Sequence, residues 1–267
     1  MSSAVRGQEA YVFDNASVHA VEQHRCLAEF LDPVTIDGLV ATGVTDGWRC
    51  LEVGAGGGSV ARWLAARVAP SGAVLATDIN PVHIPWLPGL GIRRHDITRD
   101  PLPEEAYDLA HARQVLLHLP DRLTALRRMV RSLRPGGWLV LEEFDGSYCP
   151  ALLAPDDEAA ATYGRYTESK VAVMESAGAD MSWGQRVAGA MRDAGLTQID
   201  TRPLILPWRG GSPGARLQIH TTRHLREKFL RAGITDADLA RFRGVLSDPE
   251  FVACTVLYSV RGMRPAV

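Results

Sequence analysis

Short apolar runs alternate with amphipathic segments through the middle of the chain. The runs at 48–53, 73–78 and 107–112 have the length and composition of buried strands. Between the first two, Val60, Leu64 and Val68 recur at the spacing of one helix face. Strands that alternate with helices favour a parallel sheet. The pattern therefore predicts an α/β fold with helices on both faces of the sheet.

Three further segments carry helical patterns outside this alternation. We divide the chain into four parts: an N-terminal helical extension (1–46), a core (47–145), a helical insertion (146–182) and a C-terminal part of the core (183–267). The last part carries its own helical insertion at 212–248. A helix at 18–31 is expected to end at Asp32-Pro33, with a second helix starting at Pro33. Ligands of open α/β sheets bind beyond the strand ends. The added helices are therefore expected to form a lid over the site.

The segment Leu51-Glu52-Val53-Gly54-Ala55-Gly56-Gly57-Gly58-Ser59 is a strand running into a glycine-rich turn and then a helix. Glycines allow positive φ and let a ligand lie against bare backbone, and the amides of the helix start face that ligand. Asp78 ends the second strand, about 24 residues after Gly54. An acid there commonly holds ribose hydroxyls, in nicotinamide and in S-adenosylmethionine sites alike.

Later residues separate these two cofactors. Ser59 stands where the dehydrogenase pattern has its third glycine, and we find no Tyr-x-x-x-Lys pair. A third acid, Asp96, follows the third strand, and a Pro135-Gly136-Gly137 turn leads into the fifth. The ordered series resembles the class I S-adenosylmethionine-dependent methyltransferases, closely over 48–145 and loosely elsewhere. That resemblance implies a Rossmann-like sheet of seven strands with an added helical lid.

The resemblance also implies a set of cofactor-binding residues along the strand ends: Glu52, Gly54, Gly56, Gly58, Ser59, Asp78, Ile79, Asp96, Ile97, Arg113 and His118. The glycine turn and Glu52 would hold the methionine half, and Asp78 the ribose. Asp96 and the Ile97 amide would face the adenine, and the Arg113 carbonyl the methionine ammonium. An acid that only caps a turn is the alternative reading of Asp96.

Methyl transfer needs alignment, exclusion of water and at most one base. His118, after the fourth strand, is the first candidate base, and a structural histidine is the alternative. Asp145, in a cluster with Glu142 and Glu143 at the end of the fifth strand, is the second candidate. Tyr11 is the third, in an aromatic segment, Tyr11-Val12-Phe13-Asp14-Asn15, expected to close over the ligand unless Phe13 merely packs on the cap.

Four other side chains, Tyr163, Tyr166, His220 and His224, are expected to line the pocket. The two histidines have a spacing found in zinc sites, but a third ligand is lacking nearby. The acids of the fifth strand lack the spacing of a magnesium site. We therefore expect no metal.

A formal net charge of −2 and a pI near 6.4 give no nucleic-acid footprint. We find no apolar run of membrane-spanning length and no apolar signal core at the start, so we expect a cytoplasmic protein that does not bind membranes. The expected partner is a small-molecule substrate, and a homodimer stays open.

The chain is similar to actinobacterial small-molecule methyltransferases of specialised metabolism. The Tyr-x-Phe-Asp-Asn start and the glycine turn resemble enzymes that methylate indole carbon. That resemblance implies methylation at C3 of a tryptophan-derived compound such as a cyclic dipeptide, with pyrroloindoline formation. Methylation of oxygen or nitrogen in a phenol, polyketide or amine is the alternative. A cofactor-binding cyclase or a non-methylating binding protein is the alternative of another class.

Overall fold

A computed structural model describes residue 13 and residues 17–266. These residues form one eight-stranded sheet, in the order β3-β2-β1-β4-β5-β8-β6, with β7 paired to β8. The strands are β1 Arg49–Val53, β2 Ala73–Asp78, β3 Leu90–Arg94, β4 Tyr107–Arg113, β5 Leu133–Asp145, β6 Ala151–Leu153, β7 Thr197–Arg209 and β8 Val252–Met263. Strands β1 to β5 are parallel, and β8 runs antiparallel to β5, β6 and β7.

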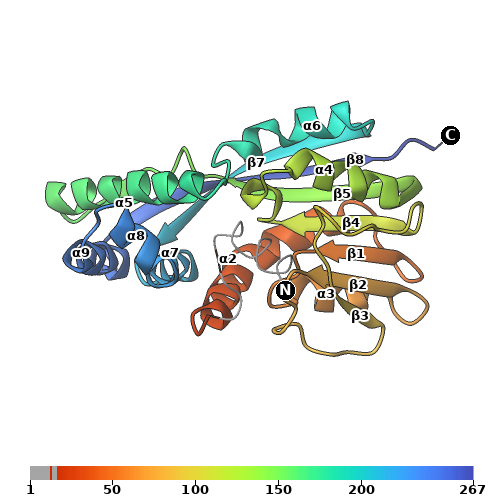
Figure 1. The fold of residues 1–267 in the computed structure, drawn as a ribbon, viewed down its shortest axis with the longest axis horizontal. Helices are drawn as coiled ribbons and strands as arrows, with labels where there is room; N and C mark the ends of the chain where they lie inside the picture. Colours follow the sequence, from red (N-terminus) through yellow and green to blue (C-terminus); the bar gives the residue numbers. More distant parts are fainter. Residues whose placement is uncertain (1–12, 14–16, 267) are drawn as a thin grey trace, which may run out of the picture.

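The predicted α/β fold class is confirmed, with helices on both faces of a mostly parallel sheet (Figure 1). The short strand β6 was not predicted and makes the sheet one strand larger than expected. The helices that follow the strands of the core are α3 Ser59–Val68, α4 Arg122–Ser132 and α6 Val187–Asp193, and two 3-10 turns, η1 Leu116–His118 and η2 Trp183–Arg186, lie beside them. The 3-10 turn η2 leads directly into α6.

The alternation of side chains along β1 divides the core between the two faces of the sheet. Leu51 and Val53 belong to one apolar cluster, together with Leu126 and Met129 of α4. Cys50, which points to the opposite face, packs in a second cluster with Leu64 of α3. Both faces of the parallel strands are therefore buried, which explains why their sequences are continuous apolar runs.

The N-terminal helix does not end at Pro33. It runs unbroken as α2 from Ala20–Val40, with Pro33 inside it. Proline removes one backbone hydrogen bond, but the helix beyond it is buried through Thr35, Gly38 and Leu39. Tertiary contacts of this buried face outweigh the local signal to stop.

The remaining helices are α5 Asp157–Ser176, α7 Pro213–His224, α8 Arg226–Arg231 and α9 Asp236–Ser247. They gather at the end of the molecule toward which β7 and β8 extend, and α2 lies between them and β1 to β4 (Figure 1). The second predicted insertion is therefore three helices. None of the helices in the described part of the chain is both long and apolar enough to cross a membrane.

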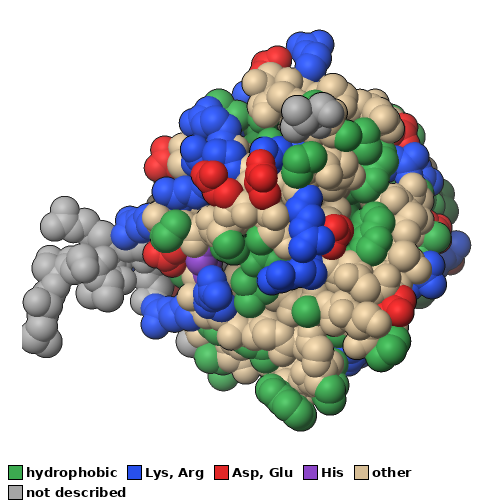
Figure 2. Space-filling model, turned by 90° about the vertical axis from the view of Figure 1, so that its right-hand side faces the viewer, with side chains coloured by type: hydrophobic (Ala, Val, Ile, Leu, Met, Phe, Trp, Pro, Cys, Tyr) green, Lys and Arg blue, Asp and Glu red, His purple; other side chains and the backbone are tan. Residues whose placement is uncertain are grey.

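The amino ends of the parallel strands lie on the opposite side of the molecule. Figure 2 looks onto that side and shows basic and acidic side chains interspersed. Two of its ion pairs join Arg134 to Asp108 at 2.9 Å and Arg264 to Glu105 at 2.6 Å. This mixture agrees with the small net charge of the chain.

Candidate active site

A cavity of about 630 Å³ opens at the carboxyl ends of β1, β2 and β4. Helices α2, α5 and α7 contribute to its wall together with these strand ends. All of the predicted cofactor-binding residues line it except Gly58: Glu52, Gly54, Gly56, Ser59, Asp78, Ile79, Asp96, Ile97, Arg113 and His118. The carboxyl ends of parallel strands meet at one edge of a sheet, and this brings together residues far apart in sequence.

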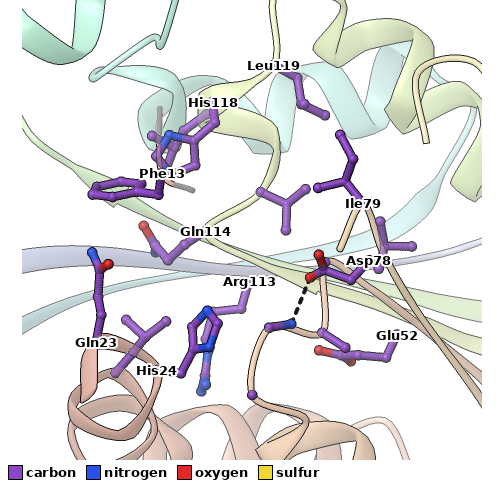
Figure 3. A pocket seen from close by; sticks show the side chains of 18 of the residues that line it. Phe13, Gln23, His24, Glu52, Asp78, Ile79, Arg113, Gln114, His118 and Leu119 are labelled. Carbon is purple, nitrogen blue, oxygen red and sulfur yellow. Dashed lines mark hydrogen bonds between the residues drawn. The ribbon is translucent and has the colours of Figure 1, made fainter. Parts of the chain in front are cut away.

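The glycine turn has a geometry that other residues would not tolerate. Gly54 has φ of 66°, and a Cβ there would lie 2.4 Å from Cγ2 of Val115. Gly56 also has positive φ, and its amide donates to Oδ2 of Asp78 at 2.9 Å (Figure 3). Gly58 instead stands at the start of α3, against Ile84 and Pro85. Gly58 therefore shapes the turn and is not among the described residues that line the cavity.

Two acids at successive strand ends face the cavity in different ways. Oδ1 of Asp78 accepts from the amide of Asn80 at 2.9 Å, so both carboxylate oxygens of Asp78 brace the loops around it. Asp96 accepts from the amide and the hydroxyl of Thr98, which is the turn-capping arrangement considered as its alternative role. Asp96 lines the cavity as well, so the two readings of this residue are compatible.

A buried charged network lies behind Glu52. Nδ1 of His111 is 2.7 Å from Oε2 of Glu52, and its Nε2 is 3.7 Å from Oε2 of Glu142. Burial alone would lower the pKa of His111, but the two carboxylates raise it to about 9. His111 is therefore a charged imidazolium at neutral pH. In the same way, the nearby His111 imidazolium and the hydrogen bond from Thr35 hold the pKa of Glu142 below its ordinary value against the effect of burial.

This network reaches helix α2 through two side chains. The hydroxyl of Thr35 donates to Oε2 of Glu142 at 2.5 Å. Nη1 of Arg113 donates to Thr35 at 2.8 Å and to Oδ1 of Asp32 at 2.9 Å, and Asp32 also accepts from the hydroxyl of Ser59. The helix, the glycine turn and the end of β4 are therefore joined by direct polar contacts.

Two neutral imidazoles, His24 and His118, line the cavity. Burial lowers the pKa of His118 to about 4, and it lowers the pKa of His24 to about 4 as well, with His83 and His224 adding to the effect. The ring of Phe13 meets His118 edge-on at 5.7 Å and His224 at 5.2 Å between centroids. Figure 3 shows Phe13 beside His118, across the cavity from Asp78.

The predicted acids of the fifth strand lie behind the cavity. The described residues that line it include none of Glu142, Glu143 and Asp145. Asp145 accepts from the hydroxyl of Ser147 at 2.5 Å and from Gln185 at 2.6 Å, so its carboxylate fixes the turn after β5. These contacts contradict a direct role for Asp145 as the base. Tyr11, the third candidate, lies outside the described residues.

Glu143 holds the loop that carries His118. It accepts from the amide of Leu116 at 2.8 Å, and its side chain is fully buried. Burial raises the pKa of Glu143 to about 8 despite these backbone hydrogen bonds. Glu143 is therefore mostly protonated at neutral pH, and it positions the 3-10 turn η1 without reaching the cavity.

Tyr163 and Tyr166 were expected to line the pocket, and this was wrong. Both are buried in an aromatic cluster with Trp208, Phe229, Phe242 and Phe251. Their spacing on α5 suits the packing of that helix against α8 and α9. His224 lies near the cavity through its contact with Phe13, whereas His220 is absent from the described residues that line it.

Several residues that the structure places in the cavity wall were missed by sequence reasoning, and three of them carry polar side chains of interest. His24 of α2 covers the glycine turn, where a Cβ on Gly56 would be 3.3 Å from its ring. Gln114, with φ of 57°, bridges to the backbone of β5. Lys170 belongs to α5. Only Gln114 carried a local signal, because it directly follows Arg113 at the end of β4.

No group of three or more His, Cys, Asp or Glu side chains in the described part of the chain is arranged to hold a metal ion.

Comparison with known proteins connects this geometry to a family. The profile of a family described as "Methyltransferase domain" matches residues 24–237. Methyltransferase str3 of Strobilurus tenacellus is 30% identical over 188 residues, which is 69% of this chain and 65% of the relative. The 27-O-demethylrifamycin SV methyltransferase of Amycolatopsis mediterranei is 27% identical over 149 residues, which is 56% of this chain and 51% of the length of that relative.

A solved structure supports the fold. The [4+2]-cyclase SpnF superposes with a TM-score of 0.53 and 17% identity, over 88% of this chain and 81% of the cyclase. The identity is low, so this likeness concerns the fold alone.

Proposed function

The chain belongs to the methyltransferase family whose profile it matches and takes S-adenosylmethionine as its cofactor, and from this premise we propose that it methylates a small, largely apolar molecule. The observation that carries the proposal is that one continuous cavity joins the glycine turn to the added helices. It is lined at one end by the glycine turn and the strand-end acids, and at the other by side chains of the lid helices. One continuous cavity thus offers room for donor and acceptor side by side, which methyl transfer requires.

The residues at the sheet edge fit the cofactor. Gly54 and Gly56 leave backbone bare where the methionine half would lie, and Glu52 offers a carboxylate to its ammonium. Asp78 stands at the end of β2, where an acid can hold two ribose hydroxyls. Asp96 and Ile97 would border the adenine. The bound cofactor supplies an activated methyl group, so the protein contributes alignment, dryness and a place for one proton.

The lid end of the cavity suits an apolar acceptor. Met174, Met181, Leu217 and Phe144 line it, together with the ring of Phe13. His118 stays neutral because burial lowers its pKa to about 4. A neutral imidazole can accept a hydrogen bond from the acceptor's N–H or O–H, and this supports His118 as the group that orients the acceptor.

Our finer proposal is C3 of an indole in a tryptophan-derived compound. In that reaction C3 attacks the methyl carbon, the bond to sulfur breaks, and the indole becomes an iminium. An internal amide nitrogen then attacks C2 and loses its proton, which gives a pyrroloindoline. Support comes from the aromatic and imidazole rings around Phe13, which suit an indole. Methylation of an oxygen or nitrogen is the second candidate, and a cyclisation without methyl transfer is the third.

Methyl-deuterated S-adenosylmethionine distinguishes these candidates. The protein is incubated with tryptophan cyclic dipeptides, N-acyl tryptamines, indole acids, phenols and amines. The masses of the products are measured by mass spectrometry, and NMR locates the labelled methyl group. Label on indole C3 is the expected result. Label on oxygen or nitrogen keeps methyl transfer and overturns the indole proposal, whereas a product without label indicates a changed reaction.

A further inference from the structure

A cationic side chain stands in the lid wall of the cavity. Lys170 of α5 and Gln218 of α7 both line it, and Nζ of Lys170 lies 3.2 Å from Oε1 of Gln218. The hydroxyl of Tyr166 donates to the same Oε1 at 2.9 Å, which fixes the Gln218 amide with its oxygen toward the lysine. The ammonium also lies 5.7 Å from the centre of the Tyr166 ring. Two lid helices therefore meet around this one charge.

Within the described part of the chain, the contacts that hold this ammonium are neutral. Among the residues that the structure describes, none places a carboxylate within ion-pair distance of Lys170, although Arg113 and Arg25, which also line the cavity, each have one. Lys170 is half-buried, and Met174 and Leu217 line the same wall. A cation that loses water in apolar surroundings without a counter-charge is costly. A ligand that supplies an anionic oxygen there removes this cost and gains a charge-assisted hydrogen bond.

We propose that Lys170 binds a carboxylate of the methyl acceptor, with Gln218 as its neutral partner in the same subsite. This inference rests on the proposed function, because it assigns the acceptor end of the cavity, and it narrows the substrate class from apolar molecules to apolar acids. The apolar wall takes the body of the acceptor, and the ammonium fixes its acidic end. Within the indole proposal, it favours a tryptophan derivative that carries both a free carboxylate and an internal amide nitrogen over a neutral cyclic dipeptide.

The test compares acids with their primary amides, which have the same shape and no charge. Indole-3-acetate, indole-3-propionate, tryptophan, salicylate and 4-hydroxyphenylacetate are titrated, each beside its amide, into protein saturated with S-adenosylhomocysteine. At least one acid is expected to bind about tenfold more tightly than its amide, the scale of one charge-assisted hydrogen bond. Lys170→Met keeps the aliphatic stem and should abolish this preference, whereas Lys170→Arg should retain most of it.

Lys228, the other lysine of the chain, provides the matched control. It lies on α8 and is not among the described residues that line the cavity, so Lys228→Met should leave the preference unchanged. The proposal is overturned if no acid in the set binds more tightly than its amide, or if the preference survives in Lys170→Met. Methyl transfer is scored separately by mass. Acids that bind through Lys170 without being methylated would uphold the subsite and refute the proposed function.

Discussion

Nδ1 of His111 lies 2.7 Å from Oε2 of Glu52, so a charged imidazolium stands behind a carboxylate that opens onto the cavity. On its other side, the imidazolium faces Glu142, which is bound in turn to helix α2 through Thr35. One buried cation thus lies between two acids, one that lines the cavity and one that is bound to helix α2.

The charge of His111 should make stability depend on pH. Its pKa is raised from an ordinary 6.5 to about 9 in the folded protein. The stabilisation is therefore fully present below about pH 6.5 and is lost as pH rises through about 9. The difference in free energy of unfolding between the wild type and His111→Asn should shrink over this range in denaturant titrations. A difference that stays constant would show that His111 is not charged in the folded state.

Substitution of Glu143 should stabilise the folded protein at neutral pH, whereas substitution of His111 should destabilise it. Burial raises its pKa to about 8, so keeping it buried costs stability as pH rises above its ordinary 4.5. Glu143→Gln retains an acceptor for the Leu116 amide and cannot ionise. Its free energy of unfolding, relative to the wild type, should increase between about pH 4.5 and 8 and then level off. A relative stability that does not vary with pH contradicts the assignment.

Asp78→Ala should weaken binding of S-adenosylmethionine by about 1.5–3 kcal/mol, since it removes charge-assisted hydrogen bonds. It also removes the acceptor for the Gly56 amide. Asp193→Ala is the control, because Asp193 is exposed, lies 3.5 Å from Arg192 and is not among the described residues that line the cavity. Calorimetric titration of both variants decides the matter, and unchanged affinity in Asp78→Ala would remove the ribose assignment.

His118→Ala should lower turnover by about a hundredfold while leaving cofactor affinity nearly intact. Because burial lowers the pKa of His118 to about 4, its ionisation should add no inflection to the pH–rate profile between pH 5.5 and 8. Single-turnover rates beside equilibrium binding separate these effects. If turnover and affinity collapse together, His118 belongs to the cofactor end.

Thr35→Val should cost about 1–3 kcal/mol of stability, because it leaves Oε2 of Glu142 without its hydroxyl donor and removes one of the two acceptors of Arg113. Thr201→Val, at an exposed position of β7, should change stability by no more than about 0.5 kcal/mol. Thermal and chemical unfolding of the pair make the comparison. Equal effects would mean that the tie between helix and sheet contributes little.

The sequence predicted the cofactor end better than the acceptor end, for a physical reason. Strand periodicity, the glycine turn and the acids Asp78 and Asp96 are local signals, and parallel strands bring their carboxyl ends to one edge. The packing of helices remote in sequence has no local signal. His24 and Lys170 enter the cavity only because α2, α5 and α7, which are remote in sequence, all contribute to its wall.

Two errors show how burial overrides local pattern. Pro33 indicated a helix end, yet the buried face beyond it keeps α2 intact. Asp145 has a residue type and a place at a strand end that suit a base, but its carboxylate accepts hydrogen bonds from Ser147 and Gln185 behind the cavity. Charge pattern also could not show that His111, near the middle of β4, would be flanked by two glutamates.

The attachment of α2 to the sheet limits how this chain can be cut or recombined. A fragment that starts at the first strand would leave Arg113 and Glu142 buried without Asp32 and Thr35. Grafting a foreign leading helix would do the same unless it carried both side chains at the matching turns. An exchange of leading helices between relatives must therefore transfer α2 together with the ends of β4 and β5 that it contacts.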